Sequence, residues 1–354
     1  MKKELLSITI TILLFVIVFC GCFEENTDKK DVEENTWISS IQNLINNAEE
    51  GDIIHISNGS YGLLTIVDKS ITLIGEDKNN TFIDQIEIKA DNVEIRGFSI
   101  IGSFLVESND TKIIDNKIIG THGGLKIYSS GNTVSNNIFE NNTEYAIMLG
   151  PNNNNTITYN IIKNTTWVPI KITKSNDNKI IGNTLYKNSN GLFIYDSNKN
   201  NISENKVTYT KLSQEAIDEY NIISYDSVGI YLDNSSNNTL SKNIVTHNEQ
   251  KGIWLTTDSN NNNIYKNNIS FNNDIGFFID GENLGNIIYS NNLISNDLYY
   301  YNDLKKYVNG YDKNIVGNNS WYYENSGNYW NDYNGTDINE DGVGEDPYIL
   351  YEIK

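Results

Sequence analysis

Two consecutive stretches, "SNNTLSKNIVTHNEQKGIWL" (Ser236–Leu255) and "SNNNNIYKNNISFNNDIGFFI" (Ser259–Ile279), are loose copies of one another. Both contain the order apolar residue, two residues, Asn, one residue, apolar residue. The pattern occurs eight times along the chain, with its asparagine at Asn116, Asn137, Asn160, Asn183, Asn205, Asn243, Asn267 and Asn291. Successive copies are 21 to 24 residues apart, apart from one step of 38 residues. A period of this length is typical of a solenoid, in which each repeat forms one coil.

Short alternating apolar runs, such as "GIYL", "GIWL" and "LFIY", fill the space between the asparagines. Such alternation predicts strands of three to five residues, because a helical repeat needs apolar residues at 3.6 spacing over ten or more residues. Three short strands per coil give a parallel β-helix. Coils of a parallel sheet are about 4.8 Å apart, so the repeated asparagines should meet in a column and bond to one another as an Asn ladder.

Both ends of the chain carry more specific motifs. "TWISSIQNLINNAEEGDIIHISNGSYGLLTIVDKSITLIGE" (Thr36–Glu76) resembles the start of right-handed parallel β-helix domains of the carbohydrate-binding and sugar-hydrolase type. "VEIRGFSI" (Val93–Ile100) resembles their first regular coil, with Phe98 where later coils carry Asn. "GNYWNDYNGTDINEDGVGEDPYIL" (Gly327–Leu350) is similar to the tail of NosD-like β-helix proteins, many of them surface proteins of methanogenic archaea. The resemblance implies an all-β, right-handed parallel β-helix solenoid of about ten coils with an N-terminal capping helix.

The N-terminus predicts export. Residues 1–22 hold two lysines, an apolar run ending at Phe19 and the box "FCGC", a combination typical of a signal peptide with a lipoprotein-like cleavage site. Cleavage before Cys22 would leave that cysteine N-terminal and lipidated, whereas an uncleaved segment would itself serve as the anchor. Residues 23–36 are charged and predict an acidic tether. We therefore expect an exported, membrane-anchored protein at the cell surface.

Beyond the tether we expect one elongated domain, because stacked coils need no second core. Its parts are the N-terminal cap and first coils at 37–102, regular repeats at 103–297 with an insertion at about 208–229, and a Tyr-rich C-terminal segment at 298–354. The net charge of −20, with Arg96 as the single arginine, argues against a nucleic-acid partner, since phosphate contacts need Lys and Arg. The same charge disfavours polyanionic sugars unless cations intervene.

The C-terminal stretch "DINEDGVGED" predicts a calcium site. Its oxygen ligands stand at alternate positions before a glycine, as in the first part of an EF-hand loop, but the bidentate Glu of the twelfth position is missing. The expected ligands of this structural calcium ion are Asp337, Asn339, Asp341, Glu345 and Asp346. The alternative is an acidic turn without metal.

The outward face of the coils carries the predicted ligand-binding residues. In "GIYL", "GIWL" and "GFFI" the first and third apolar residues should point inward, so that the second points out. Read across the coils, this column ends in four aromatic residues: Phe193, Tyr231, Trp254 and Phe278. We expect a flat apolar strip on which polysaccharide or cell-envelope glycan binds. Rings that only stack to stiffen the coils, and rings covered by the Tyr-rich segment 298–311, are the alternatives.

Catalysis and copper chemistry have weaker support. Asp233 and Asp280 lie in one outward column two coils apart, near the carboxylate separation of inverting glycosidases, and are the candidate catalytic residues of a polysaccharide-active hydrolase or lyase. Copper-enzyme maturation, which the NosD-like resemblance suggests, would need clustered His, Met or Cys. His122 and His247 are too far apart in the coils to share an ion, and His55 stands in an entry strand as a core or surface residue. We expect no copper site and favour binding over catalysis, with a purely structural envelope component as a further alternative.

Overall fold

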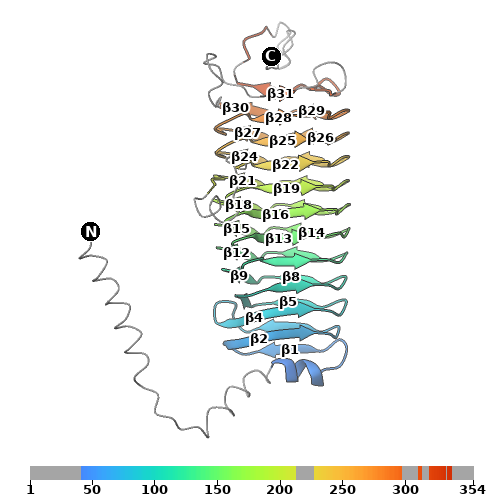
Figure 1. Ribbon diagram of the computed structural model, residues 1–354, viewed down its shortest axis with the longest axis vertical. Helices are drawn as coiled ribbons and strands as arrows, with labels where there is room; N and C mark the ends of the chain where they lie inside the picture. The colour runs from blue at the N-terminus through green and yellow to red at the C-terminus, as the bar shows by residue number, and fades with distance from the viewer. Residues whose placement is uncertain (1–40, 213–226, 297–309, 313–318, 332, 337–354) are drawn as a thin grey trace, which may run out of the picture. The chain divides into compact units, whose positions relative to one another are not determined.

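The computed structural model describes residues 41–212, 227–296, 310–312, 319–331 and 333–336 (Figure 1). Residues 41–354 form one compact unit, and residues 1–40 a separate one that lies outside the described residues. Apart from a short helix at residues 41–47, the described secondary structure consists of β-strands, which stack as coils of a parallel β-helix (Figure 1). The predicted all-β, right-handed parallel β-helix of about 10 turns is confirmed.

Each regular coil contributes one strand to each of three faces, and every pair of named strands is parallel. The first face consists of β1 (Ile53–Ile56), β3 (Thr72–Gly75), β5 (Glu94–Arg96), β8 (Lys112–Ile114), β11 (Thr133–Ser135), β14 (Thr156–Thr158), β17 (Lys179–Ile181), β20 (Asn201–Ser203), β23 (Thr239–Ser241), β26 (Asn263–Tyr265) and β29 (Ile287–Tyr289). The second face begins at two long strands, β2 (Gly59–Val67) and β4 (Thr81–Ile88), whose C-terminal halves continue into the third face.

The second face continues with β6 (Ser99–Ile100), β9 (Lys117–Ile119), β12 (Ile138–Glu140), β15 (Ile161–Lys163), β18 (Thr184–Tyr186), β21 (Lys206–Thr208), β24 (Ile244–Thr246), β27 (Asn268–Ser270), β30 (Asn292–Ile294) and β32 (Tyr329–Trp330). The third face consists of β7 (Phe104–Val106), β10 (Leu125–Ile127), β13 (Tyr145–Leu149), β16 (Val168–Thr173), β19 (Leu192–Tyr195), β22 (Ile230–Asp233), β25 (Ile253–Thr256), β28 (Phe277–Ile279) and β31 (Gly310–Asp312).

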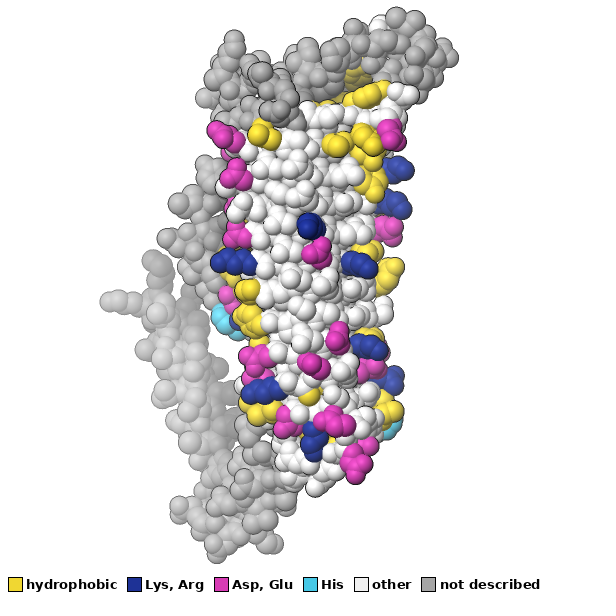
Figure 2. All heavy atoms as spheres, turned by 90° about the vertical axis from the view of Figure 1, so that its right-hand side faces the viewer, with side chains coloured by type: hydrophobic (Ala, Val, Ile, Leu, Met, Phe, Trp, Pro, Cys, Tyr) yellow, Lys and Arg dark blue, Asp and Glu magenta, His cyan; other side chains and the backbone are white. Residues whose placement is uncertain are grey.

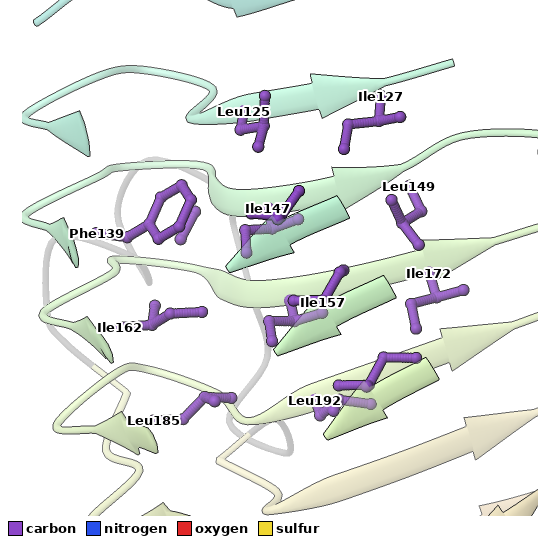
Figure 3. Packing of buried hydrophobic residues seen from close by; sticks show 14 of the residues in the cluster. Leu125, Ile127, Phe139, Ile147, Leu149, Ile157, Ile162, Ile172, Leu185 and Leu192 are labelled. Carbon is purple, nitrogen blue, oxygen red and sulfur yellow. The ribbon is translucent and has the colours of Figure 1, made fainter. Parts of the chain in front are cut away.

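The core is a set of apolar columns that run along the inside of the three faces. Alternation turns every second residue of a strand inward, and parallel register places equivalent residues of successive coils over one another. In one coil, Ile157, Ile162 and Ile172 come from the three faces, and all are fully buried (Figure 3). Burial of one such side chain contributes about 1.5–3 kcal/mol, so the stacked columns supply the main favourable term in folding.

The eight repeated asparagines lie at the corner between the first and second faces, and their side chains are at most 1% exposed. Each amide connects three coils. Asn137, for example, donates from Nδ2 to the Ile113 carbonyl of the preceding coil (2.8 Å) and to Oδ1 of Asn160 in the next coil (3.0 Å). Its own Oδ1 accepts the backbone N–H of Asn116 at 2.8 Å. The same bonds recur up to Asn291, which donates to Asn328.

Three further polar columns occupy other corners. A second Asn column, bonded in the same way, comprises Asn132, Asn155, Asn178, Asn200, Asn238, Asn262, Asn286 and Asn319. A third, at the corner between the second and third faces, comprises Thr121, Asn142, Thr165, Asn188, Thr210, Asn248, Asn272 and Asn296. A shorter one contains Ser175, Ser197, Ser235 and Ser259, whose hydroxyls accept backbone N–H groups. All four columns satisfy backbone groups that a corner would otherwise leave unpaired inside the core.

The residue before each ladder position adopts the left-handed conformation. In the first Asn column, these residues include Asn136 (φ 56°), Tyr159 (φ 56°), Gly182 (φ 68°) and Glu204 (φ 59°). One such residue bends the chain sharply while the next side chain points inward. Since glycine and asparagine tolerate a positive φ best, the Asn-rich composition follows from the number of corners as well as from the ladders.

The helix at residues 41–47 covers the first coil. Ile41 and Ile45 are buried in the core, and the Gln42 side chain bonds to both backbone groups of Ile66 in β2, at 2.9 Å to the N–H and 3.1 Å to the carbonyl. This end of the sheet is therefore closed by apolar contact and by a polar side chain, and the N-terminal helix that the resemblance implies is present. Within the described part of the chain, no helix is long and apolar enough to cross a membrane.

The ladder predicts a specific loss of stability in Asn183→Leu. The substitution leaves the Asn160 N–H and the Ile157 carbonyl without their buried partners. We expect the free energy of unfolding to fall by roughly 1–3 kcal/mol in denaturant titrations, because a buried, unpaired polar group is costly. Lys179→Leu, at an exposed position of β17, is the matched control and should stay near the wild-type value. Equal stability of Asn183→Leu and wild type would mean that the ladder amide is dispensable.

Candidate functional site

The outward column of the third face contains the predicted ligand-binding residues. The strand register aligns, from one coil to the next, Lys126, Met148, Lys171, Phe193, Tyr231, Trp254 and Phe278. We call the last four residues the aromatic strip. Alternation along β19, β22, β25 and β28 turns them away from the core, in the register that the sequence predicts.

The strip is not flat. Ring centroids of neighbouring members are 5.0 to 5.7 Å apart, but the planes are inclined by 51° between Phe193 and Tyr231, 64° between Tyr231 and Trp254, and 63° between Trp254 and Phe278. The Tyr231–Trp254 and Trp254–Phe278 pairs meet edge to face, which ring quadrupoles favour over a parallel sandwich, and the Phe193–Tyr231 pair is tilted. The expected flat platform is therefore corrected to a ribbed apolar surface, on which one ring turns its edge towards the face of the next.

Exposure decreases towards the N-terminal end of the strip. Tyr231, Trp254 and Phe278 are half-buried, whereas Phe193 is only 5% exposed and belongs to a second hydrophobic cluster outside the core, with Tyr145, Val168 and Val228. Within the described part of the chain, the indole Nε1–H of Trp254 is buried without an acceptor. The three half-buried rings are consequently the part of the strip that a ligand can reach.

Sequence reasoning missed an aromatic cage around Lys171, next to the strip. The Lys171 Nζ lies 5.2 Å from the ring centroid of Tyr145, 5.3 Å from Trp167 and 5.5 Å from Tyr195, and it also donates to the Tyr145 hydroxyl at 3.3 Å. Burial lowers the pKa of the Lys171 ammonium below its usual value, while the carboxylate of Glu144 opposes this shift. Tyr195 lies two residues beyond Phe193, so strand alternation places both side chains on the same face. This spacing was the signal in the sequence that could have located Tyr195.

A second lysine lies over the other end of the strip. The Lys251 Nζ is 5.0 Å from the Trp254 ring and 5.1 Å from the Phe278 ring, and it forms a 2.9 Å ion pair with Asp274. Both side chains of this pair are largely buried, with 12% and 16% exposure. The ammonium group of Lys251, paired with Asp274, thus contacts the Trp254 and Phe278 rings from one side.

The two candidate catalytic carboxylates flank the strip and already serve local hydrogen bonds. Asp233 ends β22 and accepts a 3.3 Å bond from the Tyr231 hydroxyl. Asp280 follows β28 and accepts the backbone N–H of Gly281 at 2.8 Å. Thr256 pairs with Asp233 in register and lies on the coil between the two. This arrangement can offer polar contacts along a bound chain; acid–base chemistry stays a prediction.

Candidate metal ligands do not gather within the described residues. There, no group of three or more His, Cys, Asp or Glu side chains has a metal-binding arrangement. His55, His122 and His247 are exposed and lie in different coils. The predicted calcium ligands at 337–346 and the predicted lipidation site at Cys22 lie outside the described residues, as does most of the Tyr-rich segment 298–354. Calcium therefore stays a prediction that metal analysis of the purified protein would test.

The match to a sequence profile defines the family of this protein, and its surface is mostly uncharged on one side. On the side shown in Figure 2, uncharged side chains and backbone predominate, and charged groups are scattered among them. The sequence profile of the family described as "Right handed beta helix region" matches residues 79–218 and 212–321. Because the match covers more than half of the chain, the protein belongs to this family. A comparison with curated proteins found no match.

Two solved structures have a similar fold. A variant of the periplasmic alginate epimerase AlgG superposes with a TM-score of 0.51 and 16% sequence identity, over 69% of this chain and 70% of that chain. The Dettilon tailspike protein superposes with a TM-score of 0.55 and 14% identity, over 79% of this chain and 65% of that chain. At such identities the similarity establishes the fold alone.

The Lys171 cage predicts a pH-dependent stability. Because the pKa of Lys171 is lowered from 10.5, the unfolded chain binds more protons than the folded chain between the folded pKa and 10.5. The cost of the buried charge is fully present below that window and disappears as the pH rises through it. Lys171→Met, which copies Met148 of the preceding coil, should therefore be more stable than wild type at pH 7, with a gap that narrows towards pH 10.5.

Unfolding by denaturant at several pH values measures this gap. Ionisation of the tyrosines that do not contact Lys171 occurs in both proteins and cancels in the difference, so the comparison is made below the alkaline range in which Tyr145 ionises. A gap that stays constant with pH would mean that Lys171 keeps its usual pKa inside the cage.

Proposed function

We propose that the protein is a non-catalytic glycan-binding protein and that polysaccharide or cell-envelope glycan binds along the aromatic strip. One observation carries the proposal: three consecutive coils present a half-buried ring at an outward position, where earlier coils have Lys126, Met148 and Lys171. These outward positions add nothing to the main core, and Tyr231 and Trp254 pack only against the smaller second cluster. A run of partly accessible rings beside polar groups suits a ligand-binding surface.

The chemistry beside the rings suits a sugar chain. Pyranose rings have apolar faces that pack on aromatic groups and hydroxyls that need hydrogen-bonding partners. Asp233, Thr256 and Asp280 supply oxygen atoms along the strip. Coils about 4.8 Å apart repeat the same contacts along the axis, which suits a repeating polymer. The epimerase of similar fold is named for alginate, and this supports a glycan ligand on such an architecture.

We also propose that the column is displayed at the cell surface. The apolar run before Phe19, the box ending at Cys22 and the charged residues 23–36 support a cleaved signal, a lipid anchor and a tether in that order. An anchored column would hold its side faces away from the membrane, where long glycans are accessible.

Trp254→Ala tests the strip. We expect affinity for the polysaccharide found in a glycan screen to fall roughly thirtyfold or more, because a central aromatic anchor is typically worth about 2 kcal/mol or more. Tyr265→Ala is the matched control, since Tyr265 stacks on Tyr289 at 5.2 Å on the first face, away from the strip. Both variants should keep the wild-type circular dichroism spectrum. Unchanged binding by Trp254→Ala would refute the proposed platform.

Mass spectrometry of the membrane fraction tests the anchor. The mature chain should begin at a lipid-modified Cys22, without residues 1–21. Cys22→Ser should lack the lipid mass and should not show the mature N-terminus at residue 22, whereas Cys20→Ser should keep both, because only the second cysteine of the box would carry lipid. An intact Met1 on a cytosolic protein would rule out export.

A further inference from the structure

A second ring column lies at the corner between the second and third faces. The residues that precede the third polar column all have a positive φ, and they are Gly120, Asn141, Asn164, Lys187, Tyr209, His247, Phe271 and Ser295. The first three are the residue types that tolerate this conformation best. Three consecutive coils then replace them with rings, at φ values of 59°, 57° and 55°. Bulky residues are rare at such angles, so the turn alone does not account for them.

These three rings form a stack that is open to solvent. Tyr209 and His247 are 4.9 Å apart at 24°, and His247 and Phe271 are 5.2 Å apart at 31°. Tyr209 and Phe271 are 46% and 49% exposed, more than any member of the aromatic strip. Burial does not explain the rings either, because half of the surface of each of the two outer rings is exposed to solvent.

A cavity of about 570 Å³ opens beside the stack. Its lining includes Tyr209 and His247, with Lys187, Lys211, Glu249 and Asn273 around them. This volume lies within the range of small-molecule sites. The combination of an apolar wall with a few charged and amide groups is that of a ligand pocket.

The charges around the cavity favour an anion. Glu249 is occupied, since its Oε2 accepts the Leu212 N–H at 3.2 Å and its Oε1 lies 3.9 Å from the Lys211 Nζ. The Lys187 Nζ lies 5.1 Å from the Tyr186 ring, and no carboxylate of the described residues lies within 4.0 Å of it. Among the described residues, Lys187 is thus an ammonium without a counter-charge at the rim of an apolar pocket, and such a group attracts a carboxylate.

We infer that this corner pocket binds a single sugar unit that carries a carboxylate, such as a uronic acid. The edges of the ring stack contact the apolar side of the sugar, Lys187 pairs with the carboxylate, and the Asn273 amide bonds hydroxyls. The net charge of −20 repels a long polyanion, so the ligand is an acidic unit on an otherwise neutral glycan. This site is separate from the aromatic strip and lies at a different position of the coil.

The test compares an acid with its ester. The probes are trisaccharides of two neutral sugar units and one terminal glucuronate or galacturonate. Each is also used as its uncharged methyl ester, and affinities are measured by titration calorimetry. At least one acid should bind roughly ten- to hundredfold more tightly than its ester, the usual range for one charged hydrogen bond. The aromatic strip, if it binds sugars, contributes equally to both forms, so this difference does not depend on the strip.

Substitutions by asparagine, which the same turn uses in earlier coils, separate binding from folding. Lys187→Asn should abolish the difference between acid and ester, and Tyr209→Asn should weaken both forms while the melting temperature is unchanged or higher. Lys199→Asn (φ 59°) and Tyr159→Asn (φ 56°) are matched controls at left-handed positions outside the cavity, and should bind as wild type does.

Three outcomes would overturn the inference. Neither acid binds, or esterification leaves the affinity unchanged, or Lys187→Asn retains the preference for the acid. A drop in the melting temperature of Tyr209→Asn without any change in affinity would assign the ring stack to stability alone.

Discussion

The amide group at the corner of each coil is the constraint on which the column depends. A coil of three short strands must turn sharply, and each turn takes one residue into the left-handed region and directs the next side chain into the core. Backbone groups at such a turn have no strand partner and no access to water, and leaving them unpaired costs about 1–3 kcal/mol each. A side-chain amide supplies both a donor and an acceptor within a short reach. The neighbouring coils offer the complementary groups, so the same residue serves at every level.

Because the corner amides and the inward residues stabilise the fold, the outward positions are free to carry function. Inward residues are fixed by the apolar columns and corner residues by the ladders, whereas the outward column of the third face changes from lysine and methionine to rings along the axis. The third corner changes in the same direction, from glycine and asparagine to tyrosine, histidine and phenylalanine. Both changes occur around β21 to β27, so one stretch of the column concentrates the chemistry on two adjoining surfaces.

The sequence predicts the parts of the structure that repeat. One template locates the first Asn column and the outward register of Trp254, because a β-helix converts sequence period directly into position. The other Asn columns had an available signal, since an asparagine lies five residues before seven of the eight ladder residues and five residues after five of them, as Asn132 and Asn142 do around Asn137. A template that requires apolar flanks at fixed offsets misses them.

The tilt of the strip and the cage around Lys171 were not predictable in this way. Ring orientation depends on the packing of each ring against the next, which no period encodes. Trp167 reaches Lys171 from the chain just before β16, where coil lengths vary. The corner rings stand four residues after the ladder asparagines, as Tyr209 does after Asn205, and this regular offset shows that the pocket column also had a signal in the sequence.

The nearest-neighbour character of the ladders also sets how the column bears mechanical load. Coils bond only to the coils directly above and below, so tension along the axis passes through each interface in series. Adding coils lengthens such a spacer without strengthening it, and its tensile limit is that of its weakest interface. Thr165 interrupts the third polar column, with a buried hydroxyl that has no partner in the described part of the chain. At that interface the load passes through the strand pairs β12–β15 and β13–β16 and through the two Asn columns, without a side-chain bond from the described residues of the third column.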